Sequence, residues 1–151
     1  GVLHQQGVLI VHHVFRPDDS RQVLEVGAMQ PLHSTALGKV LAAFDPVAHN
    51  EALETGFEAI TERTITDPAD FEAALAEVRA RGWAGDVGET WAGVASIAAP
   101  ILDRRKVPVG AVGITGAEER MLGPEGLHQR LIAAVRECAR SVSRDLGAGR
   151  F

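Results

Sequence analysis

A polar segment directly before a predicted helix is the first place where residue types and spacing suggest binding chemistry. Ser34 and Thr35 are good helix N-cap residues, and apolar side chains follow them at the spacing of one helical face. The backbone N–H groups of Ala36 and Leu37 then lie at the positive end of the helix dipole, where they can bind a carboxylate or a phosphate. An ordinary capped helix, with these groups satisfied by Ser34 and Thr35, would show the same pattern.

A glycine-flanked polar loop at residues 85–89 is the second candidate, because it leads into a pair of apolar strands. The loop contains Asp86, and the strands contain Ser96 and Thr115 as isolated small hydroxyls among apolar neighbours. A hydroxyl buried in an apolar strand is unfavourable unless it finds a hydrogen-bond partner. That partner is either a neighbouring backbone carbonyl or a bound polar ligand, and the residues alone leave both open.

Metal binding and nucleophilic catalysis are not indicated by the spacing of the reactive residues. The six histidines show no ligand spacing, and His12 and His13, adjacent on a predicted strand, point to opposite faces, so at most one of them can join a given site. Ser96 lies within a predicted strand and not on a nucleophile elbow. Cys138 falls in the apolar stripe of the last predicted helix, where a buried, inert thiol is expected. We therefore predict no metal ion, no cofactor and no catalytic residue.

The size and charge of the chain narrow the class of protein. Its 151 residues allow one domain, residues 1–151, and 46% apolar with 23% charged residues is a globular composition. The net charge of −5, with neither half strongly basic, argues against a nucleic-acid-binding surface in this chain. No apolar run is long enough to cross a membrane and no signal peptide is visible, so we expect a cytoplasmic location. The start at Gly1, without an initiator Met, suggests a fragment whose true start lies upstream.

Hydrophobic periodicity and turn residues predict an α+β fold. We expect a hairpin over residues 7–27, with strands at 7–15 and 21–27, and a short strand within 57–65. Three further strands are expected at 83–87, 94–102 and 107–115. Helices are expected after Thr35, over 46–54, between Asp67 and Gly82, and from Pro124 onward. Because hairpins join the strands and the helices come in blocks, the sheet should be antiparallel and flanked by helices.

Three ordered segments resemble the C-terminal effector-binding domain of IclR-family transcriptional regulators. Residues 31–39 match the family stretch P-L-H-x-T-A-x-G-K at every fixed position. Residues 81–103 resemble R-G-[YW]-x-x-D-x-G-E-x-x-x-G-[VL]-x-[CS]-[IV]-A-A-P-[IV]-x-D, and residues 109–120 are similar to the family's A-[AL]-[SG]-[VIL]-[ST]-G-P-x-x-R ending. The resemblance covers about residues 7 to 146, which is nearly the whole chain.

The resemblance implies a GAF-like fold, in which a curved antiparallel sheet is flanked by helices and carries a ligand pocket on its concave face. It implies a small-metabolite effector, often a carboxylate, whose acid group meets the backbone of Ala36 and Leu37. Side chains matching Asp86, Ser96, Gly113 and Thr115 would line the rest of the pocket. It further implies operator DNA binding only through an N-terminal winged helix-turn-helix domain that this chain does not contain, allosteric control of that domain, and assembly as a homodimer or tetramer.

Two positions depart from the family pattern. Gly113 stands where small-acid sensors tend to have Ser, which removes a hydroxyl and favours a larger or partly aromatic effector. Ala117 replaces the usual Pro of the third motif. Two other functions stay open at this point: an oligomerisation module with a vestigial pocket, and an enzyme on a GAF-like scaffold that uses Asp86, His33 and Ser96.

Overall fold

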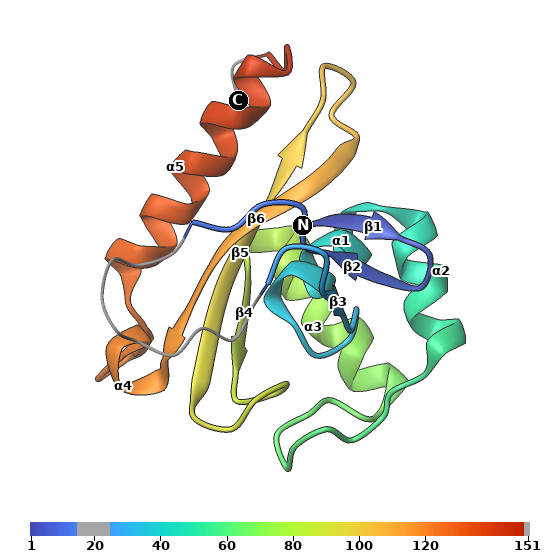
Figure 1. Cartoon of the computed structure of the whole chain (residues 1–151), viewed down its shortest axis with the longest axis vertical. Helices are drawn as coiled ribbons and strands as arrows, with labels where there is room; N and C mark the ends of the chain where they lie inside the picture. Colours follow the sequence, from blue (N-terminus) through green and yellow to red (C-terminus); the bar gives the residue numbers. More distant parts are fainter. Residues whose placement is uncertain (15–24, 150–151) are drawn as a thin grey trace.

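A three-stranded antiparallel sheet forms the centre of the computed structural model, which describes residues 1–14 and 25–149 (Figure 1). Its strands are β4 (Ala84–Val87), β5 (Val94–Leu102) and β6 (Pro108–Ala117), in the order β4-β5-β6. All three were expected at these places, because β-branched and small apolar residues run through each segment. The register pairs Asp86 with Ser96 and Ser96 with Thr115, so one cross-strand row holds all three polar candidates.

Three helices lie on one side of the sheet: α1 (Ala36–Phe44) packs directly on its strands, and α2 (Pro46–Thr55) and α3 (Pro68–Arg81) pack on α1. Local signals fix their ends, as the sequence predicts. Thr35 and Asp67 cap the N-termini of α1 and α3 with side-chain oxygens, and Gly82 ends α3 in the left-handed conformation. Helix α1 packs most closely against residues 31–32: a Cβ at Gly38 would lie only 2.4 Å from the carbonyl oxygen of Leu32.

A second small sheet departs from the predicted hairpin over 7–27. It contains β1 (Val2–His4), β2 (Gly7–Leu9) and β3 (Met29–Gln30), in the order β1-β2-β3. The partner of β2 is therefore β3, and the strand expected at 7–15 ends at Leu9. Residues 26–27 form a turn closed by the hydrogen bond from the N–H of Ala28 to the carbonyl of Glu25, and the N–H of Gly27 donates to the carbonyl of Ile10. The expected turn at 16–20 and residues 21–24 lie outside the described residues.

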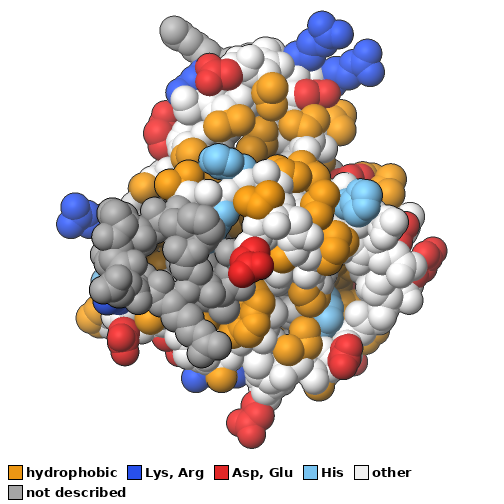
Figure 2. All heavy atoms as spheres, in the orientation of Figure 1, with side chains coloured by type: hydrophobic (Ala, Val, Ile, Leu, Met, Phe, Trp, Pro, Cys, Tyr) orange, Lys and Arg blue, Asp and Glu red, His pale blue; other side chains and the backbone are white. Residues whose placement is uncertain are grey.

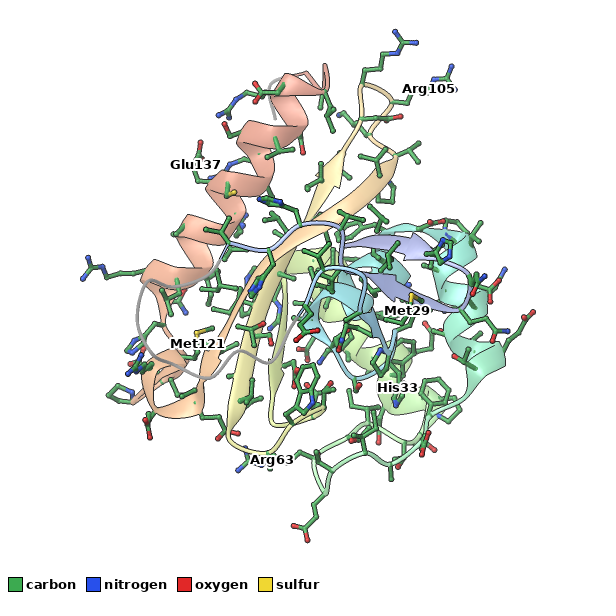
Figure 3. All side chains as sticks on the ribbon, in the orientation of Figure 1. Met29, His33, Arg63, Arg105, Met121 and Glu137 are labelled. Carbon is green, nitrogen blue, oxygen red and sulfur yellow. The ribbon has the colours of Figure 1, made fainter. Side chains whose placement is uncertain are left out.

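The segment 57–65 contains no strand, contrary to the prediction. The hydroxyl of Thr64 accepts the N–H groups of Ile60 and Thr61 and donates to the carbonyl of Glu89, so a side chain satisfies the backbone that a sheet would otherwise pair. Figure 3 shows Arg63 at this end of the molecule, where its guanidinium lies 3.0 Å from Glu118.

The C-terminal part contains short elements that the periodicity did not predict. Helix α4 (Glu118–Met121) and the β7–β8 hairpin (Leu122–Gly123, Gly126–Leu127) come before α5 (Gln129–Asp145). Helix α5 thus begins five residues after Pro124, which lies in the turn of that hairpin. Its buried residues are Ile132, Val135, Ala139 and Ser143.

The expected burial of Cys138 is wrong, since this thiol is exposed. The true buried stripe runs through Ala139 and Ser143, one residue further along the helix. Ser143 is buried because its hydroxyl accepts the N–H of Leu102 and donates to the carbonyl of Ala139. The hydrophobic pattern predicted Val142 at this core position, but the polar residue Ser143 occupies it.

Two hydrophobic clusters lie on opposite faces of the central sheet. The first joins α1, α2 and α3 to Ala98 of β5, and the second joins α5 to Ala95, Ile97 and Ala99 of the same strand. The alternation of β5 side chains divides the strand between the two clusters. Figure 1 shows this division, with α5 on one side of the sheet and α1–α3 on the other.

Candidate functional site

A cavity of about 350 Å³ lies at the N-terminus of α1 and along β6. Residues 10–13, which follow β2, and Gln30 of β3 complete its wall. This volume is at the low end of the range for ligand pockets, roughly 300–1,000 Å³, so it suits a small molecule. In the view of Figure 2, hydrophobic side chains and histidines lie near the centre of the molecule, and most Lys, Arg, Asp and Glu side chains lie toward the rim.

Five of the six residues predicted for the ligand site line this cavity: Ala36, Leu37, Ser96, Gly113 and Thr115. Ser96 and Thr115 share a hydrogen bond, with their hydroxyl oxygens 3.1 Å apart. The partner that a buried hydroxyl requires is therefore the other hydroxyl, and the pair forms a polar spot beside the apolar side chains of β5 and β6 that line the cavity.

Hydrogen bonding at the start of α1 leaves its first N–H groups to the cavity. The Thr35 hydroxyl accepts the N–H of Gly38 at 3.0 Å and donates to the carbonyl of Pro31 at 2.6 Å. The Ser34 hydroxyl accepts a hydrogen bond from Thr90 at 2.9 Å. Neither hydroxyl caps the N–H groups of Ala36 and Leu37, which have no partner within the helix.

Asp86 is the predicted site residue that lies outside the cavity lining. It is almost fully buried, and its Oδ1 accepts the backbone N–H of Glu89 at 2.8 Å. It faces the same side of the sheet as Ser96, one strand further from the cavity. Asp86 therefore supports the loop after β4 and the strand that carries Ser96.

Sequence reasoning missed His12, His13 and Trp91, all of which line the cavity. The two histidines were expected on opposite faces of a strand, but residues 10–14 form no strand and both contribute to the same wall. Trp91 comes from the loop 88–93 between β4 and β5. Single-sequence patterns did not reveal these residues, because the cavity forms where distant segments meet.

A buried polar network joins the first two motifs. The Lys39 ammonium of α1 lies 2.6 Å from the Glu89 carboxylate, and both side chains are close to fully buried. The hydroxyls of Thr61 and Thr64 donate to the carbonyls of Gly88 and Glu89, both at 2.6 Å. These contacts tie the loop 88–93, and with it Trp91, to the helix whose N-terminus faces the cavity.

The close approach of β5 and β6 explains Gly113. A Cβ at this position would lie 2.6 Å from the carbonyl oxygen of Ile97 and 3.1 Å from the Cβ of Ala98. A serine here would therefore need the two strands to move apart. Glycine at position 113 therefore allows β5 and β6 to pack closely, and it also removes the hydroxyl that a serine would place in the pocket.

Comparison with known proteins decides the family. The model of the bacterial transcriptional regulator IclR C-terminal region matches residues 1–144. The chain belongs to the IclR family. It is 73% identical over all 151 residues to the glycerol operon regulatory protein of Streptomyces coelicolor, and it spans 59% of the length of that relative.

Solved structures of the IclR family share this fold. A transcriptional regulator from Rhodococcus sp. RHA1 is 31% identical, with a TM-score of 0.87 over 96% of this chain and 59% of that one. The inducer-binding domain of PobR from Acinetobacter, a double mutant in complex with 3-hydroxybenzoic acid, is 26% identical, with a TM-score of 0.81 over 94% of this chain and 84% of that one. These relatives are transcriptional regulators and not enzymes.

The described part of this IclR-family domain shows neither a cluster of metal ligands nor a helix that could span a membrane. Across residues 1–14 and 25–149, no group of three or more His, Cys, Asp or Glu side chains could hold a metal ion. No helix among the described residues is long and apolar enough to span a bilayer.

Asp86 lies next to the cavity of this IclR-family domain, and its burial raises the pKa of its carboxyl group. Loss of hydration raises the pKa of its carboxyl from 3.8 to about 6, and the N–H of Glu89 opposes this rise only in part. The folded state thus holds this proton more tightly than the unfolded state. Ionisation above pH 6 costs stability, and this cost disappears as the pH falls through 6 toward 3.8.

Asp86→Asn is therefore expected to stabilise the domain by about 2 kcal/mol at pH 7.5, because the amide keeps an acceptor for the N–H of Glu89 and carries no charge that loses its hydration on burial. The difference from wild type should shrink toward pH 5. Urea unfolding at both pH values measures this effect. Asp70→Asn, an exposed control on α3, should change the free energy of unfolding by less than about 0.5 kcal/mol. An Asp86→Asn variant that is less stable at pH 7.5 would contradict the raised pKa.

Proposed function

We propose that this domain binds a small metabolite in the cavity at the N-terminus of α1 and thereby controls DNA binding by a winged helix-turn-helix domain of the same protein. The observation that carries the proposal is one cavity that combines free helix N-terminal N–H groups, a hydroxyl pair and an apolar wall. Such a wall fits a ligand with a polar head and a short carbon skeleton.

Residues 1–151 act in this proposal as one sensing domain. The carboxylate or phosphate of the effector binds the N–H groups of Ala36 and Leu37, while Ser96 and Thr115 hydrogen-bond its other oxygens. Gly113 leaves room for the ligand along β6, and Asp86 holds the neighbouring strand in place. The named relatives support a small oxygen-containing effector, since one regulates a glycerol operon and another binds 3-hydroxybenzoic acid.

Control of DNA binding requires that the effector bind one conformation of the protein more tightly than another. We propose that the loop 88–93 takes part in this change, because it contacts the cavity through Trp91 and α1 through the Lys39–Glu89 pair. The full protein is proposed to work in the cytoplasm as a homodimer or tetramer. Operator binding with and without effector, measured on the full-length regulator, tests this part.

A thermal-shift screen tests ligand binding directly. The panel contains glycerol, glycerate, glycerol 3-phosphate, short keto acids and hydroxybenzoates. A ligand at 100 times its dissociation constant adds about 2.7 kcal/mol to the free energy of unfolding, which gives a clear rise in melting temperature. No shift with any member of the panel would contradict the proposal and favour an oligomerisation module with a vestigial pocket.

Thr115→Val is expected to weaken binding of the active ligand about tenfold, because the methyl group keeps the shape of the wall and removes one hydrogen bond. Thr55→Val is the matched control, since the Thr55 hydroxyl bonds only within α2. Calorimetric titration of both variants measures the change. Equal affinity in Thr115→Val and wild type would mean that the hydroxyl pair does not touch the ligand.

A further inference from the structure

The described part of the cavity wall carries few ionisable side chains. Among the described residues that line the cavity, none is Asp, Glu, Lys or Arg. Of these described residues, His12 and His13 alone carry ionisable side chains. The backbone nitrogen of Gly1 also lies at this wall, where it donates to the carbonyl of Ala111 at 2.9 Å. Any selection for ligand charge by the described side chains of this wall therefore depends on the two histidines.

We propose that His12 and His13 determine ligand specificity and make the cavity select an anion, a small phosphate or carboxylate, over the neutral compound with the same skeleton. This inference rests on the proposed function and names the ligand class of that site. An anion that enters an apolar cavity loses its hydration and needs charge or N–H donors in exchange. The start of α1 supplies N–H groups and about half a positive charge, which leaves an anionic ligand incompletely neutralised.

Imidazole groups can supply the rest of the neutralisation. A neutral imidazole donates one N–H to a ligand, and an imidazolium donates two and carries a full positive charge. Histidine is the side chain that makes this change most readily near neutral pH. A neutral polyol gains no comparable charge interaction, so the two histidines discriminate between ligands of equal size.

The backbone holds the histidine segment in place at one end of the cavity. The N–H of Ile10 donates to Ala28 at 3.0 Å, and the carbonyl of Ile10 accepts the N–H of Gly27 at 2.8 Å. His12 and His13 follow within three residues of this anchor. His12 is exposed and His13 half-buried, so the segment borders both the solvent and the cavity.

Titration calorimetry with three ligands of one skeleton tests the inference: glycerol, glycerate and glycerol 3-phosphate, with inorganic phosphate as an additional probe. His12→Gln and His13→Gln, singly and together, keep polar side chains at both positions but cannot carry a charge. We expect at least one single variant to bind the preferred anion about tenfold more weakly, the double variant to lose more, and neutral ligands to bind unchanged. Arginine at the sensitive position should restore anion binding, and His4→Gln, outside the cavity, should have no effect.

The outcomes separate this inference from the function on which it rests. If the ligands bind and the double glutamine variant keeps the wild-type ratio of anion to neutral affinity, the histidines do not select charge and only the inference fails. If the wild type binds glycerol but neither anion, the inference fails and the sensing function is supported. If no ligand of the whole panel binds the wild type, the proposed function fails first and the inference with it.

Discussion

Replacing Gly38 with alanine is expected to destabilise the domain by about 3 kcal/mol or more, although the same exchange in an ordinary helix stabilises it by about 1 kcal/mol. The added Cβ would lie 2.4 Å from the carbonyl oxygen of Leu32, 2.5 Å from its Cα and 2.6 Å from the carbonyl oxygen of Pro31. All three are backbone atoms, so no side-chain rotation relieves the clash. Helix α1 must then move away from residues 31–32 and disturb the start of the helix.

Urea unfolding followed by circular dichroism measures this effect. Gly116→Ala is the matched control, because a Cβ on this residue of β6 meets only the flexible side chain of Met121, at 3.5 Å. The control should change the free energy of unfolding by less than about 1 kcal/mol. A Gly38→Ala variant as stable as the control would show that α1 does not pack on residues 31–32 as described.

Removing one partner of the buried Lys39–Glu89 pair is the second change with a large expected effect. Lys39→Met should lower the free energy of unfolding by about 3 kcal/mol, because it leaves the Glu89 carboxylate buried without its cation. One oxygen of that carboxylate, Oε1, is already buried without a hydrogen-bond partner. Burial also raises the pKa of Glu89, with Lys39 acting in the opposite direction, so the charged form depends on the lysine.

The double variant Lys39→Met with Glu89→Met separates charge from packing. It should recover most of the lost stability, since two apolar side chains of similar length need no hydration. Chemical unfolding of both single variants and the double variant forms a complete cycle. A double variant as unstable as Lys39→Met would mean that the loop 88–93 depends on the hydrogen bond itself and not on charge neutralisation.

Local signals made the main elements predictable. The capping residues Thr35, Asp67 and Gly82 lie directly next to the helices that they begin or end. The hydrophobic pattern has a clear period of two residues in β5 and of 3.6 residues in α1. The same reasoning failed where a single polar side chain decides the structure. Thr64 turns the chain in the segment expected to be a strand, and Ser143 is buried through hydrogen bonds that no hydrophobic pattern contains.

The candidate site was predictable only as far as its motifs reach. Ala36, Ser96 and Thr115 stand in motifs shared with the family, and the cavity gathers them. His12 and Trp91 stand outside the positions used for the prediction and reach the cavity because separate segments fold over β6. Asp86 shows the opposite case, in which a motif residue shapes the site from the next strand without lining the cavity.

The position of the cavity relative to the two hydrophobic clusters has a consequence for cooperativity. Cores on opposite faces of a sheet can open in separate local unfolding events, and the sheet separates the cluster under α5 from the cluster under α1–α3 in this way. The cavity is lined by Ala36 from the first cluster and by Ile97 and Val112, which belong to or pack on the second. A bound molecule therefore touches both clusters, and its binding energy is lost when either one opens. Ligand occupancy would make the unfolding of α5 and of α1–α3 a single event.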